Sequence, residues 1–103
     1  MSYPVEINPN ESLDHLAGDW KIIQLRRGHR FSTDDVAVAW VAGRVMPTAD
    51  RLLDLGCGIG SVGLLTLHRM NNPSTSLTGI EAQRVSYSLA CRTMVVNGLS
   101  DRV

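Results

Sequence analysis

The sequence predicts an α/β fold built around a parallel β-sheet. Residues 51–55 and 76–81 are short, apolar segments of the kind that form strands buried on both faces. Each is followed by a stretch with the length and apolar content of a helix. A glycine-rich turn joins the first strand to its helix, as in many α/β folds that hold a cofactor. This order of strand, helix, strand and helix specifies parallel strands joined by right-handed crossovers.

Length and composition are those of an ordinary globular chain of one domain at most. Of the 103 residues, 44% are apolar and 19% are charged, and ten basic residues balance ten acidic ones. Net charge therefore gives no indication of nucleic-acid binding. The N-terminus lacks a basic segment followed by an apolar run, so we predict no signal peptide. The longest apolar stretch, residues 36–45, is too short to span a bilayer. We expect a cytoplasmic protein that is not associated with a membrane.

The cysteines and histidines are too dispersed to predict a metal site or a disulfide framework. Cys57 lies in the glycine-rich turn and Cys91 in a predicted helix, and we expect both to be reduced thiols. His15, His29 and His68 lie far apart and have no second type of ligand at a suitable spacing. We therefore predict no metal.

The N-terminal part of the chain gives weak signals. Residues 1–19 are rich in Pro, Asn and acidic residues, and we predict an irregular lead-in to a domain that spans 20–103. Residues 20–25 are rich in β-branched and aromatic side chains, which predicts the first strand. Residues 26–30 carry three arginines; they could contact RNA phosphates, although an exposed basic loop is the default interpretation.

The segment after this loop has the signals of a helix start. Ser32 and Asp35 have the spacing of a capping box, with Asp in place of the usual Glu or Gln. Thr33 is an alternative cap. Pro47 prevents the helix from continuing, so we predict a helix over 34–46. One face of that helix carries Val36, Trp40 and Val41.

The remaining elements predict only part of a sheet. Gly98 stands where a left-handed helix cap is expected, and residues 99–103 would then lead into a third strand. A parallel sheet needs cover on both faces, and the strand that carries Asp54 would normally be central. We therefore expect these residues to form about half of a domain, with an incomplete sheet. The predicted elements after Pro47 are a strand at 51–55, a helix at 60–70, a strand at 76–81 and a helix at 82–97.

Two glycine fingerprints overlap in the turn after the first parallel strand. One is Asp54-x-Gly56-x-Gly58-x-Gly60, and the other is Gly58-x-Gly60-x-x-Gly63, which matches the GxGxxG of dinucleotide-binding folds. In a dinucleotide fold the first glycine follows the strand immediately. Counting from the strand end makes Gly56 the first glycine, so the GxGxxG match begins two residues too late. We therefore interpret Gly63 as a helix-packing residue.

The acid before this turn discriminates between cofactors. Asp54 at the strand tip would repel a pyrophosphate, whereas it suits an ammonium group such as the methionyl amine of S-adenosylmethionine. Glycines let the backbone approach such a ligand, and the helix N-terminus favours its carboxylate. Glu81 ends the next strand, where it could accept both hydrogen bonds of a ribose diol. A surface acid is the alternative interpretation of Glu81.

Three segments together resemble a known family. DLGCGIG and the downstream GIEAQ are similar to motifs I and II of class I S-adenosylmethionine-dependent methyltransferases. The segment 28–35, GHRFSTDD, resembles the GxRFSxD signature of tRNA adenine-N6-methyltransferases of the valine-tRNA type. Residues 97–103, NGLSDRV, resemble the lead into the third strand of many methyltransferases. The resemblance covers residues 20–103 and implies the N-terminal, cofactor-binding half of a Rossmann-like methyltransferase domain.

The resemblance also implies a role for individual residues in binding S-adenosylmethionine. The turn would hold the methionine part, the acid after the next strand the ribose, and the two residues that follow would border the adenine. The segment before the first helix would wall the methionine end; a core aromatic at 31 and simple helix capping at 32–34 are the alternatives. The implied residues are Asp54, Gly56, Cys57, Gly58 and Gly60 in the turn, Glu81, Ala82 and Gln83 after the next strand, and Arg30, Phe31, Ser32, Thr33 and Asp34 upstream.

The family's catalytic motif, Asn-Pro-Pro-aromatic, does not occur in this sequence. Its Asn-Pro pairs are Asn8-Pro9 and Asn72-Pro73, in the lead-in and at a helix end. We therefore assign no catalytic residue and expect little or no catalysis from these residues alone. The function implied is methyl transfer to adenine N6 of tRNA. Two alternatives remain: a non-catalytic module completed by a partner chain, and a fragment of a nicotinamide-dependent oxidoreductase, supported only by GIGSVG.

Overall fold

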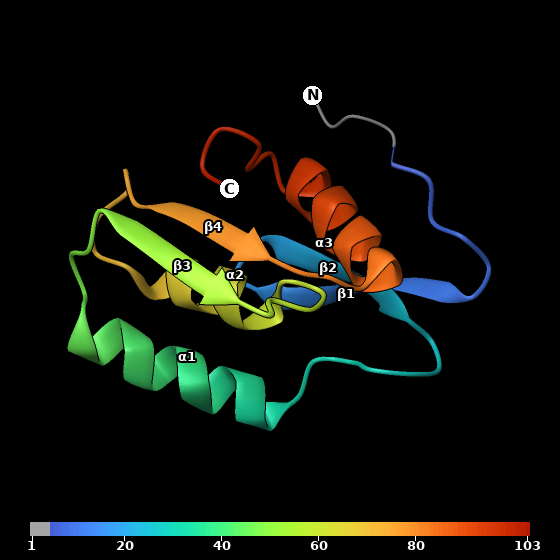
Figure 1. The fold of residues 1–103 in the computed structure, drawn as a ribbon, viewed down its shortest axis with the longest axis horizontal. Helices are drawn as coiled ribbons and strands as arrows, with labels where there is room; N and C mark the ends of the chain where they lie inside the picture. Colours follow the sequence, from blue (N-terminus) through green and yellow to red (C-terminus); the bar gives the residue numbers. More distant parts are fainter. Residues whose placement is uncertain (1–4) are drawn as a thin grey trace.

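The computed structural model describes residues 5–103 and confirms the predicted alternation of strands and helices (Figure 1). The predicted helices begin and end within two residues of the observed ones. In chain order the elements are β1 (Glu11–Ala17), β2 (Trp20–Leu25), α1 (Thr33–Val45), β3 (Arg51–Leu55), α2 (Ser61–Arg69), β4 (Ser76–Ile80) and α3 (Arg84–Val96).

The prediction of an irregular lead-in is wrong for residues 11–17. These residues form β1, which pairs antiparallel with β2 from Glu11 opposite Leu25 to Ala17 opposite Trp20. The register shifts between His15 and Ala17, and one of the two buried side chains of β1 is the charged Glu11. A bulge and a buried charge both disturb the apolar alternation by which a strand is recognised in sequence.

β3 and β4 form a separate, parallel pair. Their register runs from Arg51 opposite Ser76 to Leu55 opposite Ile80. The antiparallel hairpin does not join this pair; it packs against α2 and α3 on the far side of the helices (Figure 1). The core therefore lies between the hairpin and the helices, where Ile22 and Ile23 of β2 meet Leu64 of α2 and Leu89 of α3.

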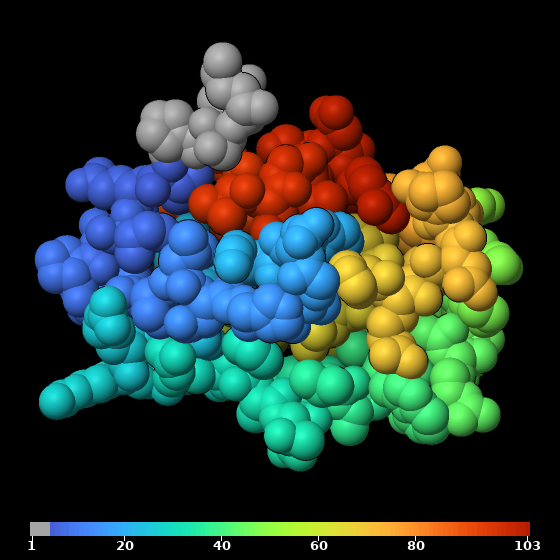
Figure 2. All heavy atoms as spheres, turned by 180° about the vertical axis from the view of Figure 1, so that it is seen from behind, coloured from blue at the N-terminus to red at the C-terminus, as the bar shows by residue number. Residues whose placement is uncertain are grey.

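Figure 2 shows the molecule from behind, with the hairpin (blue) spread between α1 below and α3 above. The outer edge of β2 is satisfied by side chains of α3 and its C-terminal end. The Ile23 N–H donates to Thr93 Oγ1 at 3.0 Å, and the Lys21 N–H donates to Asn97 Oδ1 at 2.7 Å. The hairpin thus supports α3 directly, and through it the loop that joins β4 to α3.

The parallel sheet is incomplete, as expected from the sequence. Among residues 5–103 no strand pairs with the edge of β3 that faces away from β4. Leu53 and Leu55 of β3 are 62% and 71% exposed. At the outer edge of β4, the Leu77 N–H donates to the carbonyl of Arg102 at 2.6 Å. Residues 99–103 therefore lead to the place where a further strand would begin.

Helix α1 packs on α2 through small residues. The capping interaction predicted at its start is present, since the Ser32 N–H donates to Asp35 Oδ2 at 3.4 Å. Only Ala39 and Gly43 of this helix are buried. The predicted apolar face is not the packed one. Its three residues, Val36, Trp40 and Val41, are between 43% and 53% exposed.

A buried ion pair fastens the hairpin to α3. Arg92 donates to both carboxylate oxygens of Glu11, at 2.7 and 2.6 Å, and also to the carbonyl of Glu6 at 3.0 Å. Glu11 is 4% exposed. The hydrogen bonds from Arg92 outweigh the cost of burial and lower the pKa of Glu11 from 4.5 to about 2.

Replacing Glu11 with Gln should destabilise the fold by about 2 kcal/mol, because Arg92 loses a charged partner but keeps an amide oxygen. Since the pKa of Glu11 is lowered on folding, its contribution is complete above pH 4.5 and is lost as the pH falls toward about 2. Urea denaturation at several pH values measures both effects. The exposed Asp101→Asn is the control, and equal stability of Glu11→Gln and the wild type at pH 7 would contradict the assignment.

Candidate functional site at the glycine turn

The turn between β3 and α2 presents open backbone. Gly56, Gly58 and Gly60 have φ values of +68°, +58° and +92°, in the region that favours glycine. A Cβ at Gly56 or Gly58 would meet no atom within 4 Å, whereas a Cβ at Gly60 would lie 3.0 Å from Met94 Cε of α3. The first two glycines therefore leave space beside the backbone, and the third allows α3 to pack closely.

Gly63 has the packing role that the sequence predicted. A Cβ at this position would lie 2.9 Å from Leu77 Cδ2 and 3.1 Å from Asp54 Oδ2. Helix α2 therefore approaches β3 and β4 as closely as a glycine permits. The third glycine of a dinucleotide fingerprint has the same packing role, so this contact does not distinguish the two glycine frames.

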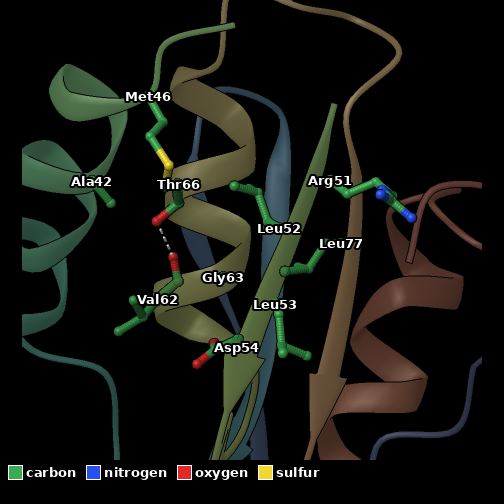
Figure 3. Close-up of a pocket in the computed structure, with 10 residues that line it drawn as sticks. All are labelled: Ala42, Met46, Arg51, Leu52, Leu53, Asp54, Val62, Gly63, Thr66 and Leu77. Carbon is green, nitrogen blue, oxygen red and sulfur yellow. Dashed lines mark hydrogen bonds between the residues drawn. The ribbon is translucent and has the colours of Figure 1, made fainter. Parts of the chain in front are cut away.

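Asp54 places a carboxylate oxygen without a partner beside the turn. Its Oδ2 is buried and has no hydrogen-bond partner among the described residues. Burial raises the pKa of Asp54; the Gly63 N–H partly opposes this shift because it lies near the carboxylate, although it does not meet the geometry of a hydrogen bond. Figure 3 shows the side chain at the end of β3, directed toward α2. It lines a cavity of about 190 Å³ together with residues of α1 and α2, among them Ala42, Met46, Gly63 and Thr66.

Glu81 lies against the same turn from the end of β4. Its Oε1 accepts from the Gly58 N–H at 2.8 Å, and its Oε2 accepts from the Gln83 N–H at 2.9 Å. The N–H groups of Gln83 and Gly58 lower the pKa of Glu81, so the side chain is an anion at neutral pH. Each oxygen keeps a lone pair for a further donor. A cavity of about 270 Å³ adjoins Glu81 and is lined by Ala82, Arg84 and Tyr87.

Cys57 packs against β4. A Cβ at Gly79 would lie 2.8 Å from its Sγ, so this thiol fills the space above the strand. Burial, followed by the negative charges of Asp54 and Glu81, raises the pKa of Cys57. Cys57 and Cys91 are both free thiols, as expected, and line a cavity of about 330 Å³ between β4 and α3.

Residues 30–34, which the resemblance assigned to the cofactor site, divide into two groups by where their side chains lie. Arg30 is directed to the hairpin, where it donates to the Leu25 carbonyl at 2.6 Å and forms an ion pair with Asp14 at 3.2 Å. Phe31 is half-buried against the core, as the alternative interpretation anticipated. Ser32, Thr33 and Asp34 are exposed at the start of α1, and Gln83 and Ala82 are exposed before α3.

The sequence analysis did not identify two sets of side-chain contacts, one made by Asp35 and one by Gln24. Asp35 Oδ2 accepts from Ser61 Oγ at 2.8 Å and so connects the first turns of α1 and α2. Gln24 Oε1 accepts from the Phe31 N–H at 3.0 Å, while Gln24 Nε2 donates to Asp14 at 2.9 Å. A buried glutamine within an apolar strand was a signal that could have been noticed, because a buried amide needs partners.

Residues 5–103 contain neither a metal-binding cluster nor a membrane-spanning helix. This part of the chain has no group of three or more His, Cys, Asp or Glu side chains that could hold a metal ion. None of its helices has both the length and the apolar character needed to cross a membrane.

Comparison with solved structures identifies the fold. PH0793 from Pyrococcus horikoshii, described as a transferase, matches with a TM-score of 0.70 and 17% identity over 92% of this chain and 35% of that chain. The SAM-dependent methyltransferase from Agrobacterium tumefaciens gives 0.65 and 20%, over 96% and 32%. The N-terminal domain of EvdMO1, with SAH and D-fucose present, gives 0.58 and 24%, over 76% and 32%. No family model and no curated protein matches this chain.

The likeness establishes a Rossmann-like α/β fold of the class I methyltransferase kind. The chain spans about a third of the length of each of these three solved structures. Asp54, the open glycines and Glu81 lie at the carboxyl ends of two adjacent parallel strands, which is where open α/β sheets bind ligands.

Proposed function

We propose that this chain binds S-adenosylmethionine at the glycine turn, as the cofactor-binding part of a class I methyltransferase domain. The observation that carries the proposal is Asp54 Oδ2, a buried acceptor without a partner beside backbone that leaves open space at Gly56 and Gly58. An ammonium group would supply the missing donor and a compensating charge. The resemblance of three sequence segments to this family supports the same cofactor.

Each part of the ligand has a partner of suitable chemistry. The methionyl ammonium fits Asp54, and the carboxylate fits the start of α2, which has no acidic residue and no side-chain cap. The ribose hydroxyls can donate to Glu81, which keeps lone pairs free. The adenine would then lie beside Ala82 and Gln83. The bound cofactor supplies an activated methyl group on a sulfonium, and the contribution of these residues is to bind and orient it.

A nicotinamide dinucleotide fits the same residues poorly. Its pyrophosphate would lie over the turn, where Asp54 and Glu81 are both negative when ionised. The GxGxxG match begins at Gly58, whereas the residue that directly follows β3 is Gly56. We therefore set the oxidoreductase interpretation aside in favour of S-adenosylmethionine.

For the methyl acceptor we propose adenine N6 of tRNA, in the cytoplasm. The support is the segment 28–35, GHRFSTDD, which resembles the signature of that enzyme group. The three arginines of residues 26–30 provide positive charge next to this segment. The sequence contains no Asn-Pro-Pro, so the groups that would hold the target amine lie outside these 103 residues.

Replacing Gly58 with Ala should weaken binding of S-adenosylhomocysteine by at least about tenfold, because a Cβ would fill the space through which the ligand approaches the backbone. Gly98→Ala is a matched control. Gly98 has a φ of +67° and, like Gly58, open space around an added Cβ, but it lies after α3.

Both alanine variants should lose about 1–2 kcal/mol of stability from the left-handed backbone. Isothermal calorimetry measures the affinity and urea denaturation the stability. Equal affinity in the two variants would contradict a ligand at Gly58, and binding of NADH but not of S-adenosylhomocysteine by the wild type would overturn the cofactor assignment.

Residues 1–103 alone should transfer methyl groups to tRNA at no more than the background rate, since they lack the motif that holds the amine. A polypeptide that supplies the Asn-Pro-Pro-aromatic motif should restore transfer, with N6-methyladenosine as the product. Labelled S-adenosylmethionine followed by nucleoside mass spectrometry measures both. Turnover by residues 1–103 alone, or a product other than N6-methyladenosine, would contradict the respective part of the proposal.

The bare side of β3 supports a second candidate, a cofactor-binding module completed by a partner chain. Leu53 and Leu55 are exposed on this strand, and Ile80 at the end of β4 is 54% exposed. A parallel strand exposed on one edge and one face is energetically unfavourable, because such strands are normally covered on both faces. Because side chains stand out of the plane of a sheet, a polypeptide that both adds a strand to β3 and covers this face would bury these side chains.

If a partner chain completes the sheet, the tagged protein should purify from its own cells with a second polypeptide in equal amount. Replacing Leu53 and Leu55 with Lys should abolish this association, since two charges would have to be buried under the covering polypeptide. Leu13→Lys on the hairpin, where the side chain is 45% exposed, is the control. A wild-type chain that stays monomeric and soluble would contradict the candidate.

A further inference from the structure

The segment from Arg30 to Asp35 crosses from the hairpin to the glycine turn, and we refer to it as the strap. It comprises the end of the connection between β2 and α1 and the first three residues of α1, 33–35 (Figure 1). Its first end is fixed to the hairpin by Arg30, which reaches Asp14, and by the Phe31 N–H, which reaches Gln24. Gln24 is 2% exposed, so this end is attached to the buried interior.

The second end of the strap is fixed to the cofactor turn by Asp35. Its Oδ2 accepts from Ser61 Oγ at 2.8 Å, and Ser61 directly follows Gly60. Ser61 is 4% exposed. Across residues 5–103 this is the one side-chain hydrogen bond that connects the strap with the turn or with α2.

Between the two attachments, Thr33 and Asp34 are exposed, and the described residues provide no side-chain hydrogen bond to either. Asp35 also accepts from the Ser32 N–H, but at 3.4 Å this helix-capping contact is the longer of its two bonds. If Asp35 only capped α1, it would not need a bond to Ser61. The shorter of its two hydrogen bonds therefore connects α1 with α2 and does not close the first turn of α1.

We propose that Asp35 and Ser61 are positioning residues that hold the first turns of α1 and α2 together at the residue that follows the glycine turn. This inference rests on the proposed binding of S-adenosylmethionine and adds to it a determinant of affinity. The hydroxyl of Ser61 donates to Asp35, so losing it loosens the first turn of α1 beside the glycine turn, whereas Ala39 and Gly43 keep the two helices packed farther along. Ligand binding then has to restore an order that the wild type already possesses.

Ser61→Ala should weaken S-adenosylhomocysteine binding by about tenfold, the effect of losing one hydrogen bond to a carboxylate. Asp35→Ala should do the same, and the double variant should be no weaker than either single one, because both changes remove the same bond. Asp35→Asn keeps an oxygen that can accept from Ser61 and should retain most of the wild-type affinity. Calorimetry measures all four affinities.

Thr75→Val is the matched control. Thr75 is 0% exposed and loses a hydroxyl as Ser61 does, but its bond goes to the Ala49 carbonyl, before β4 and away from the glycine turn. We expect near wild-type affinity for this variant. Hydrogen exchange without ligand should be faster at residues 32–35 in Ser61→Ala and unchanged there in Thr75→Val.

The outcomes separate this inference from the proposed function. If the wild type binds no S-adenosylhomocysteine, the proposed function fails. If the wild type binds and Ser61→Ala binds equally well, only the positioning role is overturned. Equal losses in Ser61→Ala and Thr75→Val would also overturn it, because the effect would then follow from losing any buried hydroxyl and not from the strap.

Discussion

The parallel pairing of β3 with β4 determines where every polar group of the site lies. Leu55 opposite Ile80 brings the two strands to an end at the same level. Asp54 and Glu81 therefore flank one turn, although 26 residues separate them in the sequence. The Gly56 and Cys57 N–H groups both donate to the Ile80 carbonyl, at 2.8 and 3.0 Å, and so continue the pairing into the turn. The turn is held by these backbone bonds together with the bond from the Gly58 N–H to Glu81 Oε1, while Asp54 Oδ2 has no partner among the described residues.

The hairpin gives this small sheet a rigid support. Two parallel strands with one bare face would not be stable by themselves. The hairpin buries Ile22 and Ile23 under α2 and α3, and the Glu11–Arg92 pair fastens it to α3. Because α3 begins at Arg84, just after Glu81, this support extends to the loop that places the carboxylate beside Gly58. The N-terminal residues therefore stabilise the site from a distance, without contributing a group to it.

The sequence was sufficient to predict the elements that follow local rules. The turn frame, the role of Gly63 and the bounds of β2 and β3 were predictable, because glycine positions and short apolar runs have direct structural meaning. β1 was not, since its inward side chains include Glu11, whose partner Arg92 lies 81 residues away. The destination of Arg30 was not predictable either. A resemblance between motifs assigns residues to a site by position, whereas the side chain is directed by Asp14, which the motif does not contain.

Different sides of β3 serve cofactor binding and completion of the sheet. The residues around the turn are ordered by hydrogen bonds among themselves and to the hairpin, so their arrangement does not depend on the uncovered side of β3. That uncovered side carries the exposed Leu53 and Leu55, whereas Asp54 of the same strand is directed toward α2. Apolar side chains there suit further strands and helices that would cover the sheet. The carboxylate that would bind the cofactor and the side chains that need cover therefore lie on opposite faces of one strand.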